Sequence, residues 1–163
     1  MTETSETSRY LRPGRYVDSD HPEIVDFARS VVAGARSDRE RAARLFTAVR
    51  DRVRYDPYRI SSDPDDYRAS AILGTEASWC VPKAVLLAAV ARAVGIPARL
   101  GFADVRNHLS SPKLRATMGT DLFIYHGYAE LFIDGAGHKA TPAFNKELCE
   151  RFGVRPLEFD GST

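Results

Sequence analysis

Residues 79–105 read WCVPKAVLLAAVARAVGIPARLGFADV, and this segment carries the strongest structural signal in the chain. Its first half predicts a helix, because Pro82 suits a first helical turn, residues 84–94 are apolar on nearly all sides, and G-I-P at 95–97 ends the run. A helix that is apolar all round is buried. Its second half, residues 98–105, predicts a short strand. The stretch therefore predicts a central buried helix that leads into a sheet.

Two amphipathic helices are expected before this stretch. The pattern D-x-x-E at 20–23 places an aspartate N-cap before an apolar stripe that runs to about Gly34. The pattern S-x-x-E at 37–40 precedes a second stripe that ends near Tyr55. Residues 55–70 contain two Asp-Pro pairs and little periodicity, which is typical of a surface loop.

The second half of the chain favours antiparallel strands. A strand with period-two alternation begins at Leu122, and DGAG at 134–137 predicts a hairpin turn into a second strand. Residues 106–121 are expected to be a polar connection, and residues 145–152 a short helix. Helices followed by antiparallel strands indicate an α+β domain in which the buried helix packs against the sheet.

Composition limits the function classes. A chain of 163 residues with 44% hydrophobic and 28% charged residues predicts one ordinary domain at 19–163, after a flexible lead-in at 1–18. The 23 Lys and Arg against 22 Asp and Glu give no basic face for nucleic acid or for a membrane surface. The longest apolar run, 84–91, is far short of the ~20 residues that span a bilayer. Without a secretory signal pattern, we expect a cytoplasmic protein.

Cys80 is the candidate nucleophile. It opens the buried helix, where unpaired backbone N–H groups and the helix dipole favour a negative charge. This position is expected to lower the pKa of the thiol, and the same N–H groups could hold the oxyanion of a tetrahedral intermediate. The alternative is a small buried hydrophobe, the commoner fate of a free cysteine. Cys149, in the short helix after the strands, is expected to be buried and inert.

A thiol nucleophile needs a base, and the chain offers four histidines. His21 lies in a capping turn, His108 in the polar connection and His138 just after the hairpin turn, where a solvated histidine is the default. His126 lies within a strand, on the more polar face, where its ring would project into a cleft beside the buried helix. His126 is therefore the candidate base. The cysteines and histidines lack the short spacing of zinc ligands, so we expect no metal and no other cofactor.

Four segments together resemble the transglutaminase-like superfamily of papain-fold cysteine enzymes, in the form of a bacterial stand-alone domain: VRDRVRYDPY at 49–58, the stretch 78–105, YHGYAELFIDG at 125–135 and the T-P pair at 141–142. The similarity covers about residues 20–145. Its most specific part is a cysteine opening a helix that ends in A-R-A-x-G-I-P-A-R, with a histidine in H-x-x-x-E-x-x-x-D-G. The resemblance implies a papain-like α+β core, Cys80 as nucleophile, and His126 as general base and then general acid.

The third catalytic position departs from the family pattern. The family usually places an aspartate there in a D-P-T context, where it orients the imidazole. The matching T-P pair here begins with Thr141, whose hydroxyl can accept the same hydrogen bond but brings no charge. Alternatively, pairing of Ile133 with His138 would set Asn145 opposite His126, and its amide could orient the ring. Both alternatives remain open at this point.

Three further residues accompany the candidate pair. Trp79 is either a core anchor or a functional residue, as a wall of the acyl-donor pocket or as a donor near the oxyanion. Tyr128 could line the same cleft, although aromatic residues in strands are usually packing residues. Glu130 shares a face with His126 at roughly 13 Å, so we expect it to pair with a basic side chain or to contact substrate.

The sequence predicts a cysteine-dependent acyl-transfer enzyme. Cys80 would attack the carbonyl of a peptide, amide or thioester donor, and water or an amine acceptor would resolve the resulting thioester. Hydrolysis is favoured, because many small family members resemble proteases and no calcium loop is visible. The alternative is a catalytically weak or inactive binding module of the same fold, because Thr141 occupies the aspartate position.

Overall fold

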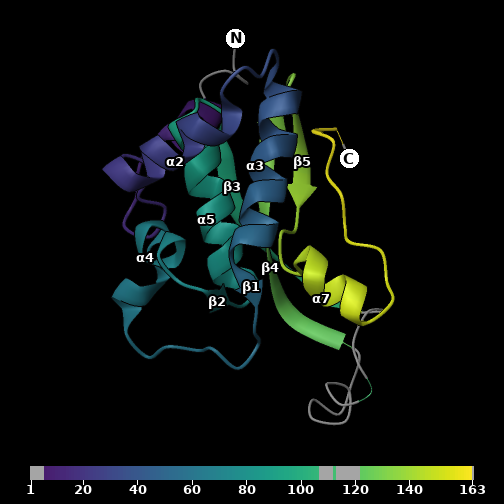
Figure 1. Cartoon of the computed structure of the whole chain (residues 1–163). Helices are drawn as coiled ribbons and strands as arrows, with labels where there is room; N and C mark the ends of the chain where they lie inside the picture. The colour runs from purple at the N-terminus through teal and green to yellow at the C-terminus, as the bar shows by residue number, and fades with distance from the viewer. Residues whose placement is uncertain (1–5, 107–111, 113–121, 163) are drawn as a thin grey trace.

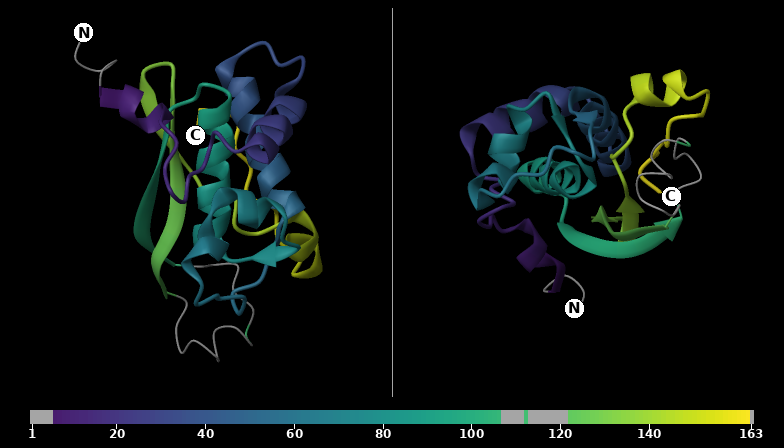
Figure 2. Two further views of the ribbon diagram at one scale, coloured as in Figure 1. Left: turned by 90° about the vertical axis from the view of Figure 1, so that its left-hand side faces the viewer. Right: turned by 90° about the horizontal axis from the view of Figure 1, so that it is seen from below.

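Helix α5 (Cys80–Ala93) runs through the middle of the fold, with helices on one side and an antiparallel sheet on the other (Figures 1 and 2). The structure, a computed structural model, describes residues 6–106, 112 and 122–162. The helices are α2 (Pro22–Val32), α3 (Asp38–Arg52) and α4 (Ala69–Leu73). The sheet has the order β3-β4-β5 and consists of β3 (Ala98–Arg106), β4 (Leu122–Ile133) and β5 (Ala136–Ala140). The expected α+β class is confirmed.

The core forms around α5. All residues from Pro82 to Ala91 are buried, which confirms the prediction of a buried central helix. Leu45 and Phe46 of α3 and Leu131 of β4 belong to the same core and are fully buried. Each such side chain contributes about 1.5–3 kcal/mol relative to full exposure. The N-terminal end of α5 is therefore held in place by packing along the whole length of the helix.

The hairpin between β4 and β5 has a different register from the one expected. Ile133 pairs with Ala136, and His138 pairs with Leu131, so the expected pairing of Ile133 with His138 is wrong. The reason is a two-residue turn at Asp134 and Gly135, whose φ values are 53° and 79°. The ladder ends at Ala140, and consequently the sequence argument that set Asn145 opposite His126 does not hold.

The helix boundaries largely follow the capping signals. Ser37 caps α3 as expected and accepts a hydrogen bond from the Glu40 N–H at 3.1 Å. The first helix differs, because its N-cap is His21 rather than the expected Asp20, and the His21 Nδ1 accepts from the Glu23 N–H at 3.3 Å. The helix expected over residues 145–152 is confirmed as α7 (Lys146–Arg151).

Short elements interrupt the loop expected at 55–70. The helical turn η2 (Pro64–Tyr67) lies within it, and α4 begins at Ala69. Two-residue strands β1 (Arg54–Tyr55) and β2 (Ala77–Ser78) form a separate parallel pair. Elements of two to five residues are too short for a hydrophobic period to reveal them. This β1–β2 pair places Tyr55, which follows the end of α3, beside Ser78, the residue before Trp79.

The described part of the N-terminal lead-in, residues 6–18, packs against the domain. Its helical turn η1 (Arg9–Leu11) stacks Tyr10 on Phe132 of β4 with ring centroids 5.4 Å apart, and Figure 2 shows this turn beside the sheet. Most of the polar connection expected over 106–121, including His108, lies outside the described residues. In the described ranges, no helix has both the length and the apolar character needed to cross a bilayer.

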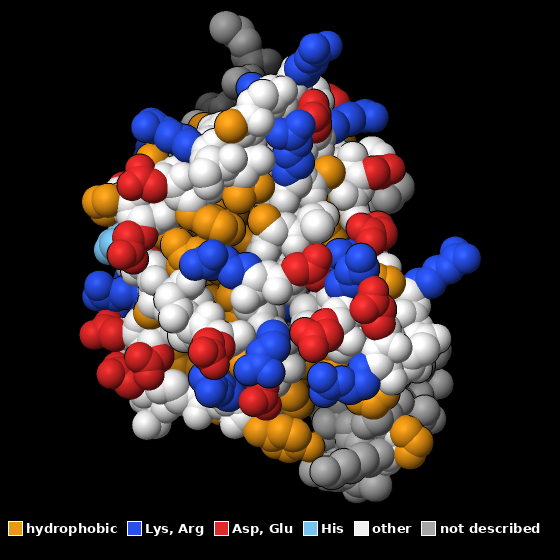
Figure 3. All heavy atoms as spheres, in the orientation of Figure 1, with side chains coloured by type: hydrophobic (Ala, Val, Ile, Leu, Met, Phe, Trp, Pro, Cys, Tyr) orange, Lys and Arg blue, Asp and Glu red, His pale blue; other side chains and the backbone are white. Residues whose placement is uncertain are grey.

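Charged side chains of both signs alternate over the face shown in Figure 3. On α3, Arg41 pairs with Asp38 at 2.7 Å and Arg44 pairs with Glu40 at 2.6 Å. The arginines of this helix thus share the surface with carboxylates, and exposed pairs of this kind contribute little to stability.

Candidate active site

Cys80 is the first residue of α5, and Trp79 is the N-cap. The preceding residue, Ser78, pairs in parallel with Tyr55 of β1, and the Asp56 N–H donates to the Ser78 carbonyl at 2.8 Å. The cysteine is therefore fixed from one side by the β1–β2 pair and from the other by the buried helix. Its side chain is 7% exposed.

The Cys80 sulfur is buried and lies against backbone donors. The N–H groups of Gly127, Val81 and Cys80 itself point to the sulfur and favour the thiolate. Burial has the larger effect and raises the pKa of the Cys80 thiol, which contradicts the lowered pKa that we expected from the helix terminus. The desolvation of a thiolate at 7% exposure outweighs three backbone donors. In the resting structure the thiol is therefore neutral at pH 7.

Gly127 lies where the first turn of α5 meets β4. The β5 partners of β4 end at Ala129, so β5 leaves the edge of β4 at Gly127 unpaired. This edge is where the Gly127 N–H reaches the Cys80 sulfur. Since His126 directly precedes Gly127, the sulfur and the candidate base belong to adjoining parts of the fold.

His126 is buried, with 6% of its surface exposed, and pairs across the sheet with Ala103 of β3. It lies on the more polar face of β4, which it shares with Tyr128 and Glu130. The buried residues Ala129 and Leu131 face α5, whereas His126 alternates with them and shares its face with Tyr128. Burial lowers the pKa of His126 below its ordinary value, so the ring is neutral at pH 7.

Asn145 is buried and connects the chain after β5 to β1. Its Oδ1 accepts a hydrogen bond from the Tyr55 N–H at 3.0 Å. The Tyr55 ring packs against Phe144 with centroids 4.5 Å apart. Burial, together with the nearby Cys80 and Asp56, raises the pKa of Tyr55. Tyr55 is thus a half-buried phenol in the electrostatic surroundings of Cys80, and the sequence argument did not identify it.

The other expected site residues lie on or next to the sheet. Thr141 is half-buried and directly follows the last residue of β5. Tyr128 lies over Gly101, where any Cβ would overlap its ring, and the Lys139 Nζ lies 5.2 Å from the ring centroid. Glu130 pairs with Arg99 at 2.5 Å, which confirms the expectation of a basic partner.

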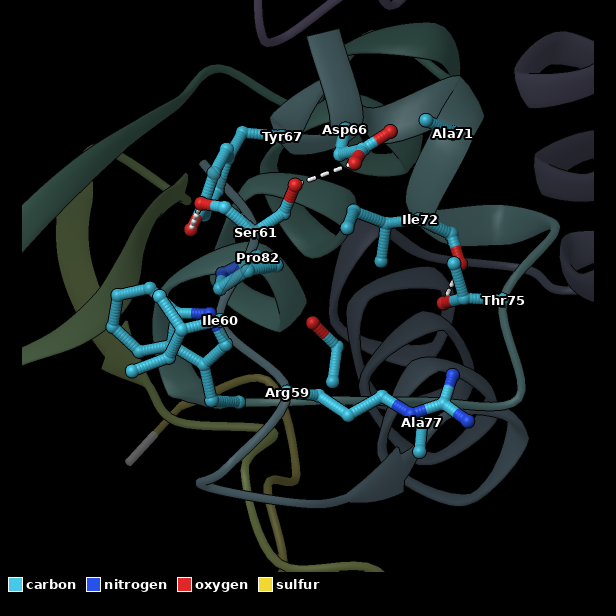
Figure 4. Close-up of a pocket in the computed structure, with 12 residues that line it drawn as sticks. Arg59, Ile60, Ser61, Asp66, Tyr67, Ala71, Ile72, Thr75, Ala77 and Pro82 are labelled. Atoms are coloured by element: carbon cyan, nitrogen blue, oxygen red, sulfur yellow. Dashed lines mark hydrogen bonds between the residues drawn. The ribbon is translucent and has the colours of Figure 1, made fainter. Parts of the chain in front are cut away.

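Trp79 separates two cavities. A cavity of about 470 Å³ on one side is lined mainly by apolar side chains, including Val81, Leu100 and Phe102. A cavity of about 320 Å³ on the other side is more polar and is lined by residues of the η2 turn and α4. Figure 4 shows this second cavity, with the Ser61 hydroxyl directed to the Asp66 carboxylate at 2.5 Å.

The wall between the cavities is aromatic. Trp79 and Tyr67 meet edge to face, with ring centroids 6.1 Å apart, and both residues line both cavities. The Trp79 Nε1–H is buried and has no acceptor within the described parts of the chain. This indole donor belongs to the residue that directly precedes Cys80 in the sequence.

Cys149 belongs to α7 and not to the first turn of α5. Cys149 is buried on α7, its Sγ lies 3.9 Å from the Phe144 carbonyl oxygen, and burial raises its pKa. Over the described ranges, no group of three or more His, Cys, Asp or Glu residues could hold a metal ion.

Lys83 is a residue that the sequence argument passed over. It lies on α5 three positions after Cys80 and is 0% exposed. Its Nζ donates to the carbonyl oxygens of Arg50 at 2.9 Å and Ala143 at 2.7 Å. The signal was present in the sequence, because a single lysine within an otherwise apolar helix must either reach solvent or find acceptors inside.

The comparisons agree with this architecture. The chain belongs to the transglutaminase-like superfamily, whose family model matches residues 25–140. Among solved structures, it is similar to a candidate cysteine protease from Cytophaga hutchinsonii, with 21% identity over 85% of this chain and a TM-score of 0.67. The chain spans 42% of that protein, and at this identity the likeness concerns the fold. No curated protein matches the chain.

Proposed function

We propose that the protein is a cysteine-dependent acyl-transfer enzyme in which Cys80 is the nucleophile and His126 the base. The observation that carries the proposal is the location of the Cys80 sulfur: it lies at the first turn of α5 against the N–H of Gly127, the neighbour of His126. Backbone donors concentrated at a nucleophile are also suited to an oxyanion. Membership of a superfamily of cysteine enzymes supports the same reading.

The proposed reaction begins from a neutral pair. As the Cys80 sulfur forms a bond to the donor carbonyl, its proton passes to the imidazole of His126, and the carbonyl oxygen becomes an oxyanion held by backbone N–H groups of the first turn. The intermediate collapses with cleavage of the carbonyl bond to nitrogen or sulfur, and the imidazolium protonates the departing amine or thiol. A thioester on Cys80 remains.

The second half of the reaction releases the acyl group. His126 removes a proton from water or an amine, the new oxygen or nitrogen attacks the thioester, and the Cys80 thiol is restored. Water gives hydrolysis and an amine gives transamidation. We propose hydrolysis as the main outcome in a cytoplasmic, bacterial setting.

Thr141 is the better of the two proposed partners for the His126 ring. The Asn145 Oδ1 already accepts a hydrogen bond from the Tyr55 N–H of β1, whereas the Thr141 side chain makes no such hydrogen bond to β1. Extending the observed β4–β5 register by one residue would set Thr141 opposite Tyr128, on the same face as His126. Thr141 would orient the imidazole as a neutral acceptor.

The acyl donor is proposed to bind beside Trp79. The apolar cavity of about 470 Å³ adjoins Val81, the residue after Cys80, and suits an apolar group of the donor. The Trp79 Nε1–H supplies a donor without an acceptor at the same wall. Tyr128 of the sheet is a further proposed contact of the acyl donor.

Turnover measurements test the proposal. Aryl thioesters and short peptide anilides are offered to the unaltered protein, Cys80→Ala and His126→Ala, with and without an added primary amine. We expect both substitutions to lower kcat/KM by at least ~10³-fold, and the products to show whether water or amine accepts the acyl group. Turnover by Cys80→Ala at the unaltered rate would remove the proposal.

A second candidate is a binding module of the same fold without turnover. The raised pKa of the Cys80 thiol and the threonine at the third position favour it. A folded, unaltered protein that binds acyl donors but releases no product would support this candidate.

A further inference from the structure

Lys83 joins three parts of the fold from inside the core. It is carried by α5, and its Nζ donates to the Arg50 carbonyl near the end of α3 and to the Ala143 carbonyl in the chain that follows β5. With 0% exposure, its amine has no contact with solvent. We call residues 141–146 the post-β5 segment.

The post-β5 segment leads from Lys83 to the surroundings of Cys80. Its Asn145 accepts from the Tyr55 N–H at 3.0 Å, and its Phe144 packs on the Tyr55 ring. The Lys146 N–H donates to the Asp51 Oδ1 at 2.9 Å. Tyr55, which lies in the electrostatic surroundings of Cys80, therefore depends on this segment for its position.

The site matches a neutral amine. A neutral amine has two N–H groups, and the Lys83 Nζ meets two carbonyl oxygens, so an ammonium would have a third donor to satisfy. In the part of the chain that the structure describes, no carboxylate lies within ion-pair distance of Lys83. The two contacts thus satisfy both N–H groups of a neutral amine, whereas no ion pair among the described residues compensates the charge of an ammonium.

The charged and titratable groups around Lys83 lie on α3 and α7. Asp51 favours the ammonium, Cys149 does so only as a thiolate, and the Arg50 guanidinium opposes it. Asp51 is already engaged by Arg50 at 3.0 Å and by the Lys146 N–H. Burial outweighs all three groups and lowers the pKa of Lys83 to about 7.

We propose that Lys83 is a proton-sensitive positioning residue of the site: as a neutral amine it ties the post-β5 segment to α3 and α5, and protonation weakens that tie. The direction of the pH dependence follows from the linkage between opening of the segment and proton binding. When the segment opens, water reaches the Nζ and the ammonium becomes favourable, so the open form binds the proton more tightly than the closed form. Acid therefore favours opening, and neutral to alkaline pH favours the closed arrangement. For catalysis, this inference rests on the proposed function of Cys80, but the opening itself does not.

Hydrogen exchange of the unaltered protein tests the opening. Exchange rates of the post-β5 segment, corrected for the intrinsic effect of pH, are compared at about pH 6 and about pH 8.5, with amides in the middle of α5 as the internal reference. We expect the segment to exchange faster than the reference, and its protection to fall about tenfold or more on acidification. Unchanged protection, or exchange only at the rate of α5, would overturn the proposal.

Two matched substitutions isolate the amine. Lys83→Met keeps the length of the side chain and removes the titration, so we expect the protection of the segment to become independent of pH. Lys146→Met removes an exposed lysine from the same segment and should leave the pH response unchanged. A pH response that persists in a folded Lys83→Met would overturn the proposal. If Lys83→Met does not fold, the comparison within the unaltered protein decides.

The two proposals can fail separately. Turnover by Cys80→Ala would remove the proposed function while a pH-dependent opening of the segment still stood. Loss of turnover in Cys80→Ala together with pH-independent exchange would support the proposed enzymatic function and contradict the proposed role of Lys83.

Discussion

The backbone of Gly127 rests directly on Val81: a Cβ placed on this glycine would stand 2.8 Å from the Val81 Cγ2 and 2.9 Å from its Cα. Only a residue without a side chain allows β4 and the first turn of α5 to approach this closely. Cys80 adjoins one partner of this contact and His126 adjoins the other. The contact therefore sets the separation between the proposed nucleophile and base.

Gly127→Ala should disturb the site more than the fold. The added methyl group forces the first turn of α5 away from β4, which we expect to cost about 1–3 kcal/mol in the free energy of unfolding. Turnover should fall at least ~10-fold, because a small misplacement of reacting groups is costly. Denaturant unfolding and steady-state kinetics measure the two effects. Gly14→Ala is the matched control, since nothing lies within 4 Å of a Cβ there.

The pH profile of kcat/KM should report a neutral thiol and a neutral imidazole. Burial lowers the pKa of His126, so activity should fall on acidification with an apparent pKa below the ordinary value of about 6.5. Burial raises the pKa of Cys80, so activity should not decline between pH 7 and pH 9. A preformed ion pair of thiolate and imidazolium would instead lose activity in that alkaline range. Rate measurements from about pH 5 to about pH 10 distinguish the two cases.

The parts of the fold that the sequence predicted are those with long hydrophobic patterns. The apolar run of α5 and the alternation in β4 extend over enough residues to identify a buried helix and a strand. The register of the hairpin was missed because DGAG allows more than one loop length. The two residues Asp134 and Gly135 favour the shorter loop, since both adopt positive φ.

The position of Cys80 in the fold could be predicted from the sequence, but its electrostatics could not. Cys80 at the start of α5 was located from the sequence, whereas the burial that raises its pKa depends on packing by distant segments. The same limit applies to Asn145. Its bond to the Tyr55 N–H joins residues 90 positions apart, and no local pattern indicates it.

Thr141 tests how the imidazole is oriented. Thr141→Val keeps the shape of the side chain and removes the acceptor, so we expect kcat to fall about tenfold or more. Thr141→Asp adds a carboxylate that stabilises the imidazolium, so kcat should stay the same or rise. Steady-state rates with unchanged circular dichroism check both. A folded Thr141→Val with full activity would show that another group orients His126.

Asn145 should act through Tyr55. Asn145→Leu leaves the Tyr55 N–H buried without its acceptor, which we expect to cost about 1–3 kcal/mol in the free energy of unfolding. Asn145→Asp keeps an oxygen acceptor at the same place and should lose less. Denaturant unfolding of the two variants gives the comparison. Equal stability of Asn145→Leu and the unaltered protein would contradict the contribution of this hydrogen bond.

Acyl capture on the two buried cysteines shows whether Cys80 is the nucleophile. An aryl thioester is mixed with the unaltered protein, Cys80→Ala and Cys149→Ala, the reaction is quenched in acid within the first turnover, and peptide mass spectrometry locates the acyl group. We expect an acyl adduct on Cys80 in the unaltered protein and in Cys149→Ala, and none in Cys80→Ala. An adduct on Cys149, or capture that survives Cys80→Ala, would contradict it.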